Sequence, residues 1–194
     1  TAPGESDIDA LYAQTEPMMI QAIRDHAELI PGMLELASAL RRKNMKIGTS
    51  TGYSAPMMDV LLPKVREQGF VPDAVVCSSD VPAGRPYPWM GLLNAIRLQV
   101  YPLEALVKIG DTLSDIEAGL NAGMWTIGLS RSGNELGMTR QESEALDQED
   151  LDTRLEAARN RFETAGAHYV VEGIWEVLPI LKAIEKRLSR GERP

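Results

Sequence analysis

The fold is decided by residues 107–115, VKIGDTLSD, where a short apolar run ends in a glycine that is followed by two carboxylates. Residues 106–109 read as a buried strand, with one lysine, Lys108, inside it. Asp111 comes just after this strand and Asp115 four residues later, so both carboxylates can face one point. Carboxylate oxygens suit a hard cation such as Mg²⁺. We therefore predict that Asp111 and Asp115 bind a metal, while Asp115 could also cap the helix that follows.

The same alternation of strand and helix extends over most of the chain. Predicted strands are residues 45–50, 74–77, 125–129 and 168–171, and predicted helices are residues 31–43, 54–68, 89–98, 114–122 and 174–188. This order is typical of an α/β fold with a doubly wound, mostly parallel sheet and helices on both faces. Two regions depart from it. Residues 7–26 predict two short helices broken at Pro17, and the polar residues 130–165 predict a surface excursion with one or two helices.

Composition and charge argue against several classes of protein. Of the 194 residues, 44% are apolar and 25% are charged, which indicates a folded globular protein. A net charge of -8 argues against nucleic-acid binding, because that function needs clustered basic residues. No run of about 18 apolar residues occurs, so we expect no membrane span. The lone Cys77 cannot form an intrachain disulfide, which predicts a buried thiol and a cytoplasmic location.

Two further polar clusters follow predicted strands, where the ligands of such a sheet bind. Residues 48–53, GTSTGY, precede a helix, and their free N–H groups suit a phosphate, although a helix cap is the commoner role of a residue such as Thr51. Residues 84–89, GRPYPW, form a loop stiffened by prolines. That loop presents Arg85, whose planar guanidinium group fits phosphate oxygens. Arg85 could instead be a solvated surface residue, and we expect Trp89 to be a core anchor.

The order of these three clusters resembles that of the haloacid dehalogenase superfamily. In that superfamily a strand ending in a hydroxyl residue, a basic residue and a strand ending in Gly-Asp follow one another along the chain. Within it, this chain resembles the phosphonoacetaldehyde hydrolase family, because the common phosphatases have lysine where Arg85 stands here. The segments that carry this closer resemblance are residues 50–53, 80–90, 121–126 and 166–169. The resemblance runs from about Ile8 to the carboxyl end.

The resemblance implies a Mg²⁺-dependent phosphonatase of phosphonate catabolism, a hydrolase that splits the C–P bond of phosphonoacetaldehyde to give acetaldehyde and phosphate. By their place in the motifs, the residues that would bind the small phosphonate substrate are Thr51, Gly52, Tyr53 and Arg85. The resemblance further implies that Asp111 binds Mg²⁺ and that Asp115 orients the metal shell. Thr51, Arg85 and Asp115 would then be the catalytic residues of this chain.

The chain departs from the family in the residues that would form covalent intermediates. The family has a strand with a nucleophilic aspartate, which becomes an aspartyl phosphate, and a helical cap with a lysine that forms a Schiff base with the aldehyde. Neither has a matching position here. We assign residues 1–25 to the C-terminal part of the cap domain and residues 26–194 to the core domain. We therefore expect the chain as given to be inactive and to have two unpaired sheet edges, and the complete protein to be a homodimer.

Two other interpretations stay open at this point. A phosphomonoesterase or phosphomutase of the same superfamily would carry a second aspartate two residues after the nucleophile, as a general acid. A non-catalytic fragment that serves as an interaction module would have its own start codon beside Thr1.

Overall fold

The computed structural model describes residues 4–194, and the first three residues of the predicted cap segment 1–25 lie outside the described residues. The helices are α1 (Glu5–Asp25), α2 (Met33–Arg42), α3 (Ala55–Glu67), α4 (Trp89–Leu98), α5 (Leu113–Asn121), α6 (Arg140–Ala145), α7 (Gln148–Thr164) and α8 (Val177–Ser189). The strands are β1 (Gly48–Ser50), β2 (Ala74–Val76), β3 (Val107–Gly110), β4 (Trp125–Leu129) and β5 (Tyr169–Val171). The predicted α/β alternation is therefore confirmed, with bounds that differ by a few residues.

All strand pairs are parallel, and the described strands form two sheets. β1 pairs with β2, with Thr49 opposite Val75. β3, β4 and β5 form the second sheet, with Ile127 of β4 opposite Ile109 on one side and Tyr169 on the other. Among the described strands no backbone ladder joins the two sheets, so one edge of β1 and one edge of β3 stay unpaired, as the sequence predicts.

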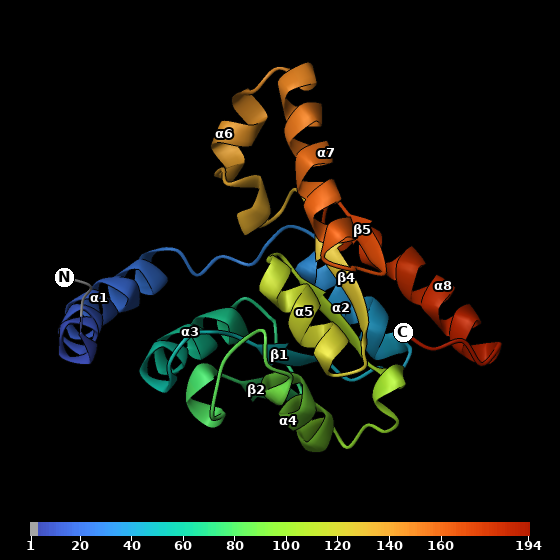
Figure 1. The fold of residues 1–194 in the computed structure, drawn as a ribbon, viewed down its shortest axis with the longest axis horizontal. Coiled ribbons are helices and arrows are strands. Elements are labelled where there is room, and N and C mark those ends of the chain that lie inside the picture. Colours follow the sequence, from blue (N-terminus) through green and yellow to red (C-terminus); the bar gives the residue numbers. More distant parts are fainter. Residues whose placement is uncertain (1–3) are drawn as a thin grey trace.

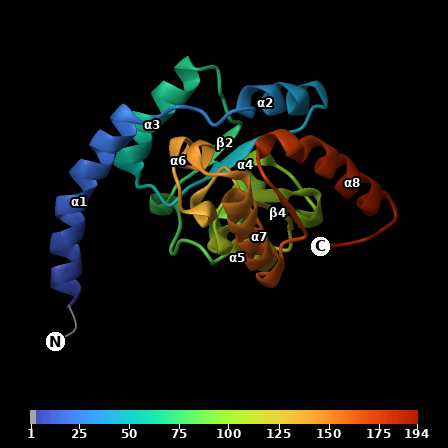
Figure 2. The ribbon, with the colours of Figure 1, turned by 90° about the horizontal axis from the view of Figure 1, so that it is seen from above.

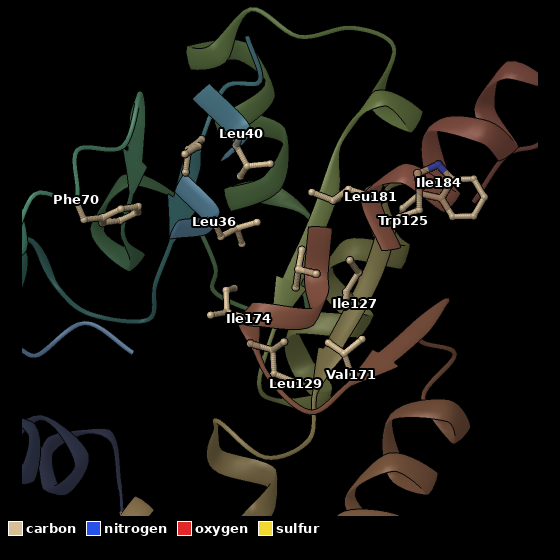
Figure 3. Packing of buried hydrophobic residues seen from close by; sticks show 12 residues of the cluster. Leu36, Leu40, Phe70, Trp125, Ile127, Leu129, Val171, Ile174, Leu181 and Ile184 are labelled. Atoms are coloured by element: carbon tan, nitrogen blue, oxygen red, sulfur yellow. The ribbon is translucent and has the colours of Figure 1, made fainter. Parts of the chain in front are cut away.

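Helices cover both faces of the second sheet, which is the doubly wound arrangement that the sequence predicts. Figure 2 shows β4 between α2 and α8 on one side and α5 and α7 on the other. On the first side the main core joins the two helices to the strands, and its labelled members in Figure 3 include Leu36, Leu40, Ile127, Val171 and Leu181. β4 is buried along its whole length. β3 of this sheet ends just before Asp111, whereas the predicted site residues Thr51 and Arg85 follow strands of the first sheet.

The prediction of two short helices broken at Pro17 is wrong. α1 is one continuous helix with Pro17 inside it, and it extends away from the core in Figures 1 and 2. α1 packs against α3, and the Ser54 hydroxyl before α3 donates a hydrogen bond to Glu16 at 2.8 Å. We infer that this packing outweighs the local cost of an interior proline. The contact also joins the predicted cap segment to the loop after β1.

The expectation that Trp89 anchors the core is also wrong, because its side chain is 42% exposed. The buried face of α4 carries Met90, Asn94, Ala95 and Leu98, which recur at helical spacing. Trp89 is the first residue of the helix and lies off that face. Cys77, in contrast, is a free buried cysteine, as predicted.

The polar residues between β4 and β5 form two α-helices, within the range that the sequence predicts. The longer one, α7, packs against β5, and its Phe162 is fully buried beside Gly128 of β4. A Cβ atom at Gly128 would lie 2.7 Å from the Phe162 ring, so that position requires glycine. Leu136, Leu151 and Leu155 form a small core of their own within the excursion. Among the described residues, no helix has the length and apolar character that crossing a membrane requires.

Candidate active site

Asp115 lies at the centre of a cluster of charged and hydroxyl groups near the ends of β1 and β3. Its side chain is only 4% exposed. Oδ1 forms an ion pair with the Lys108 ammonium at 2.8 Å. Oδ2 forms an ion pair with the Arg85 guanidinium at 2.8 Å and accepts a hydrogen bond from the Thr112 hydroxyl at 2.7 Å. Lys108 also donates to the Ser50 hydroxyl at 2.8 Å. We call Ser50, Arg85, Lys108, Thr112 and Asp115 the Asp115 cluster.

The turn from β3 into α5 places Asp115. Thr112 is the N-cap residue, and its hydroxyl faces both the backbone N–H and the carboxylate of Asp115. A Cβ atom at Gly110 would lie 2.2 Å from that of Asp115, so the close turn requires glycine there. Burial alone would raise the pKa of Asp115. The charge and hydrogen bond of Lys108, the hydrogen bond from Thr112 and the charge of Arg85 together lower this pKa below its ordinary value. Asp115 is therefore an anionic anchor for two cations.

The loop that carries Arg85 is fixed from both sides. After Arg85, the carbonyl oxygen of Pro86 accepts a hydrogen bond from Asn121 of α5 at 2.9 Å. Before it, Asp80 pairs with Arg97 of α4 at 3.0 Å. Because both ends are tied to helices, the guanidinium group is held in place before any ligand binds. Arg85 is therefore not a freely solvated surface residue, which was the alternative that the sequence left open.

The loop after β1 lies beside Arg85. A Cβ atom at Gly52 would be 3.3 Å from Nη2 of Arg85, so the glycine backbone approaches the guanidinium group closely. The Thr51 hydroxyl accepts the backbone N–H of Tyr53 at 3.1 Å. The carbonyl oxygen of Tyr53 in turn accepts two hydrogen bonds from Ser78, at 3.0 and 2.9 Å. These bonds shape a loop whose backbone faces the same region as Arg85.

Asp111 has a different set of neighbours, in the loop that follows β4. Its Oδ2 accepts hydrogen bonds from the backbone N–H of Asn134 at 3.0 Å and from the Asn134 amide at 2.8 Å. A Cβ atom at Gly133 would lie 2.2 Å from that of Asp111, so glycine is required for this approach. Asp111 lines a cavity of about 790 Å³ together with Arg131 and Trp175. Thr51, Arg85 and Asp115 do not line this cavity.

Asp111 suits a Mg²⁺ ion better than Asp115 does. Its Oδ1 makes no hydrogen bond or ion pair with any described residue, and the carboxylate borders a cavity. Both oxygens of Asp115 already face cations. No group of three or more His, Cys, Asp or Glu side chains that could hold a metal occurs within residues 4–194. Mg²⁺ often takes one or two protein carboxylates and completes its shell with water and substrate phosphate, so Asp111 fits as such a ligand.

Sequence reasoning missed two residues of this region. Lys108 was noted only as a lysine in a core strand, yet a charge in that position requires a buried anionic partner, which could have indicated Asp115. Asn134 lies in the polar stretch 130–165, to which the sequence pattern assigns no role in the site. Its place after β4 was a usable signal, because β4 ends beside β3 in a parallel sheet.

Comparison with known proteins places the chain in a family. A family profile described as haloacid dehalogenase-like hydrolase matches residues 2–123. A phosphonoacetaldehyde hydrolase of Syntrophobacter fumaroxidans is 56% identical over 192 residues, which are 99% of this chain and 69% of that protein. A phosphonoacetaldehyde hydrolase of Nitratidesulfovibrio vulgaris is 47% identical, with the same coverage of 99% and 69%.

A solved structure agrees with these relatives. The crystal structure of a phosphonoacetaldehyde hydrolase-like protein from Oleispira antarctica matches with a TM-score of 0.97 and 38% identity, and the match covers 100% of this chain and 70% of that one. The fold, the order of the motifs and the sequence identity therefore agree, and the chain belongs to the phosphonoacetaldehyde hydrolase family of the haloacid dehalogenase-like hydrolases.

Proposed function

We propose that this protein hydrolyses the C–P bond of phosphonoacetaldehyde to acetaldehyde and phosphate, and that the described residues form the phosphate-binding part of its site. The observation that carries this proposal is the approach of Arg85 to the Gly52 backbone while Asp115 holds the same guanidinium group. A fixed guanidinium group beside a glycine backbone suits the oxygens of a phosphoryl group. Family membership supports the reaction.

In this proposal each residue has a part that follows from its position. Arg85 binds the phosphoryl oxygens and stabilises the charge that develops on them. Thr51 and the Gly52 backbone bind the same group from the β1 side, with Tyr53 near the organic part of the substrate. Asp115 acts by keeping Arg85 in place, since neither of its oxygens is free of a cation.

We assign Mg²⁺ to Asp111, with the loop at Asn134 fixing the carboxylate. A bound Mg²⁺ ion would neutralise charge on the phosphoryl group. The carboxylate of Asp111, held by this loop, lies at the edge of the cavity. The proposed substrate is a small phosphonate, and the proposed location is the cytoplasm.

A homodimer through the cap helices is the oligomeric state we propose. α1 supports it, because Leu11, Met18 and Met19 are large apolar side chains that are 66%, 72% and 40% exposed. Sedimentation of the complete reading-frame product measures this directly, and a monomer at micromolar concentration would rule it out.

The function is tested by incubating the product of the complete reading frame with phosphonoacetaldehyde and Mg²⁺ and measuring acetaldehyde and orthophosphate. We expect equal amounts of both products. Arg85→Ala should remove about 2 to 4 kcal/mol of transition-state stabilisation, because a preorganised charge donor is lost. The loss is measured as a lower kcat/KM. Arg154→Ala removes an exposed arginine of α7 and serves as the matched control.

A borohydride trap distinguishes the proposed reaction from phosphate-ester hydrolysis. Borohydride reduces an imine between protein and aldehyde to a stable adduct, so a phosphonatase is labelled covalently in the presence of substrate. Labelling together with acetaldehyde release supports the proposal. Turnover of phosphate monoesters without labelling would instead assign the protein to the phosphomonoesterases.

A further inference from the structure

Lys108 occupies a position in β3 where an apolar residue would be expected. Its strand neighbours Val107 and Ile109 pack against the main core, so the Lys108 side chain lies on the opposite face, toward α5. A Cβ atom at Gly119 of α5 would lie 2.6 Å from Cγ2 of Thr126 and 2.9 Å from the Cβ of Lys108, so glycine at that position makes room for both side chains. α5 therefore passes close to β3 at the point where the Lys108 side chain leaves the strand.

The ammonium group of Lys108 joins the two sheets. The side chain is 15% exposed, and Nζ lies 2.8 Å from Oδ1 of Asp115 and 2.8 Å from the Ser50 hydroxyl. Asp115 follows β3 in the second sheet, whereas Ser50 is the last residue of β1 in the first. No backbone ladder joins the described strands of these sheets, so the side-chain contact spans a junction that the main chain leaves open.

The contacts place Lys108 and Arg85 on the two oxygens of one carboxylate. Arg85 also borders Gly52, and Lys108 holds Ser50, two residues before that glycine. The geometry points to a positioning role: Lys108 fixes the loop after β1 relative to Arg85, with Asp115 as the common anchor. This inference rests on the proposed function, because it concerns the phosphate site.

Loss of the ammonium group should therefore change the site without removing any group that we assign to phosphate binding. The Ser50 hydroxyl would no longer accept a hydrogen bond from Lys108. Asp115 would keep only Arg85 as a cationic partner. The Thr51 hydroxyl and the Gly52 amide would then shift relative to the guanidinium group. Weaker phosphate binding follows, because the donors no longer converge on one point.

The test compares Lys108→Met with Ser50→Ala and with Lys186→Met, which alters an exposed lysine of α8 and is the matched control. Orthophosphate is titrated by calorimetry, and backbone amides are followed by NMR. We expect the orthophosphate Kd to rise about tenfold in Lys108→Met, a size typical of residues that orient a binding group, and less in Ser50→Ala. The amide signals of residues 50–52 should shift in both ligand-free variants and stay unchanged in Lys186→Met.

Chemical rescue separates positioning from general stability. The Lys108→Cys variant is unfolded, alkylated with 2-bromoethylamine and refolded. This treatment restores an ammonium group on a stem of similar length. We expect the orthophosphate Kd to return toward the wild-type value, while wild-type protein carried through the same treatment controls for modification of Cys77. Failure of rescue in a correctly refolded, fully alkylated protein contradicts the proposal.

The outcomes distinguish this inference from the proposed function. Suppose that Lys108→Met keeps the wild-type orthophosphate Kd and the amide signals of residues 50–52, while Arg85→Ala binds orthophosphate more weakly. This result would overturn the role of Lys108 and leave the phosphate site intact. Unchanged orthophosphate binding in Arg85→Ala would instead overturn the phosphate site. If Lys108→Met does not fold, Ser50→Ala decides, because it keeps the Lys108–Asp115 pair. A wild-type orthophosphate Kd and unshifted amide signals of residues 50–52 in Ser50→Ala would then contradict the inference.

Discussion

Asp80 is held by one partner close to it in the sequence and by one on the neighbouring helix. Asp80, at the start of the Arg85 loop, accepts the backbone N–H of Cys77 at 2.8 Å and pairs with Arg97 of α4. The backbone bond from Cys77, followed by the hydrogen bond from Arg97, lowers the pKa of Asp80 to about 2. The carboxylate form is therefore more stable in the folded chain than in the unfolded one.

We expect Asp80→Asn to lower the free energy of unfolding by about 1 kcal/mol at pH 7, less than the shift alone implies because the side chain is 30% exposed. Because the folded pKa lies below the ordinary value of 3.8, this stabilisation is present above pH 3.8 and is lost as the pH falls toward about 2. Urea unfolding of both proteins at several pH values measures the difference. If the difference in the free energy of unfolding between the two proteins stays constant down to pH 2, the stabilising role of the Asp80 carboxylate is contradicted.

At this scale the sequence predicts residues with local signals and misses those with distant partners. The spacing of Asp111 and Asp115 after a strand is a local signal that makes both carboxylates candidates for the site. Nothing near Lys108 in the sequence indicates Ser50, which lies 58 positions away. The spacing also suggests that both aspartates face one metal, whereas the structure gives them different neighbours, Asn134 for Asp111 and two cations for Asp115.

The element that positions the site most directly is α5. Its N-cap, Thr112, belongs to the Asp115 cluster, and its Asn121 holds the Arg85 loop. Gly119 leaves space for Lys108 on the face that meets β3. One helix thus fixes Asp115, Arg85 and Lys108 relative to one another, which explains why the stretch that decides the fold also carries the chemistry.

Two N-cap threonines allow a matched comparison. Thr112→Ala and Thr139→Ala each remove a cap, but the Thr112 hydroxyl also donates to a buried carboxylate, whereas Thr139 and Glu142 form an exposed capping box. We expect a loss of about 2 kcal/mol for Thr112→Ala and about 1 kcal/mol or less for Thr139→Ala. Chemical denaturation measures both free energies of unfolding. Equal losses would show that the bond to Asp115 adds nothing to the cap.

Elements were predicted best where periodicity and end signals agree. α4 has the predicted bounds, and α7 follows the helical spacing of its buried residues Leu151, Leu155, Ala158 and Phe162. Pro17 predicts a break in α1, but contacts with α3 keep the helix continuous. Trp89 was placed in the core by its residue type alone, and the helical period excludes it.

The two sheets differ in how the rest of the molecule supports them. In the second sheet β4 is fully buried and pairs with both β3 and β5, with helices on both faces. The first sheet has two short strands with α4 against them. Within the described residues the Asp115 cluster links the two sheets through side chains, with Lys108 and Arg85 as its cations. Such a link resists separation less than a backbone ladder does.

This difference predicts two levels of stability in native-state hydrogen exchange followed by NMR. Amides of β4 should exchange only through global unfolding, because that strand is paired on both sides and buried throughout. Amides of β1 and β2 should exchange at a lower free energy, through local separation of the first sheet. Orthophosphate with Mg²⁺ should raise the free energy for β1 more than for β4, because a ligand that bridges the loop after β1 and Arg85 stabilises only the closed arrangement. Equal exchange free energies in both sheets, with or without ligand, would mean that the side-chain link alone makes the molecule one cooperative unit.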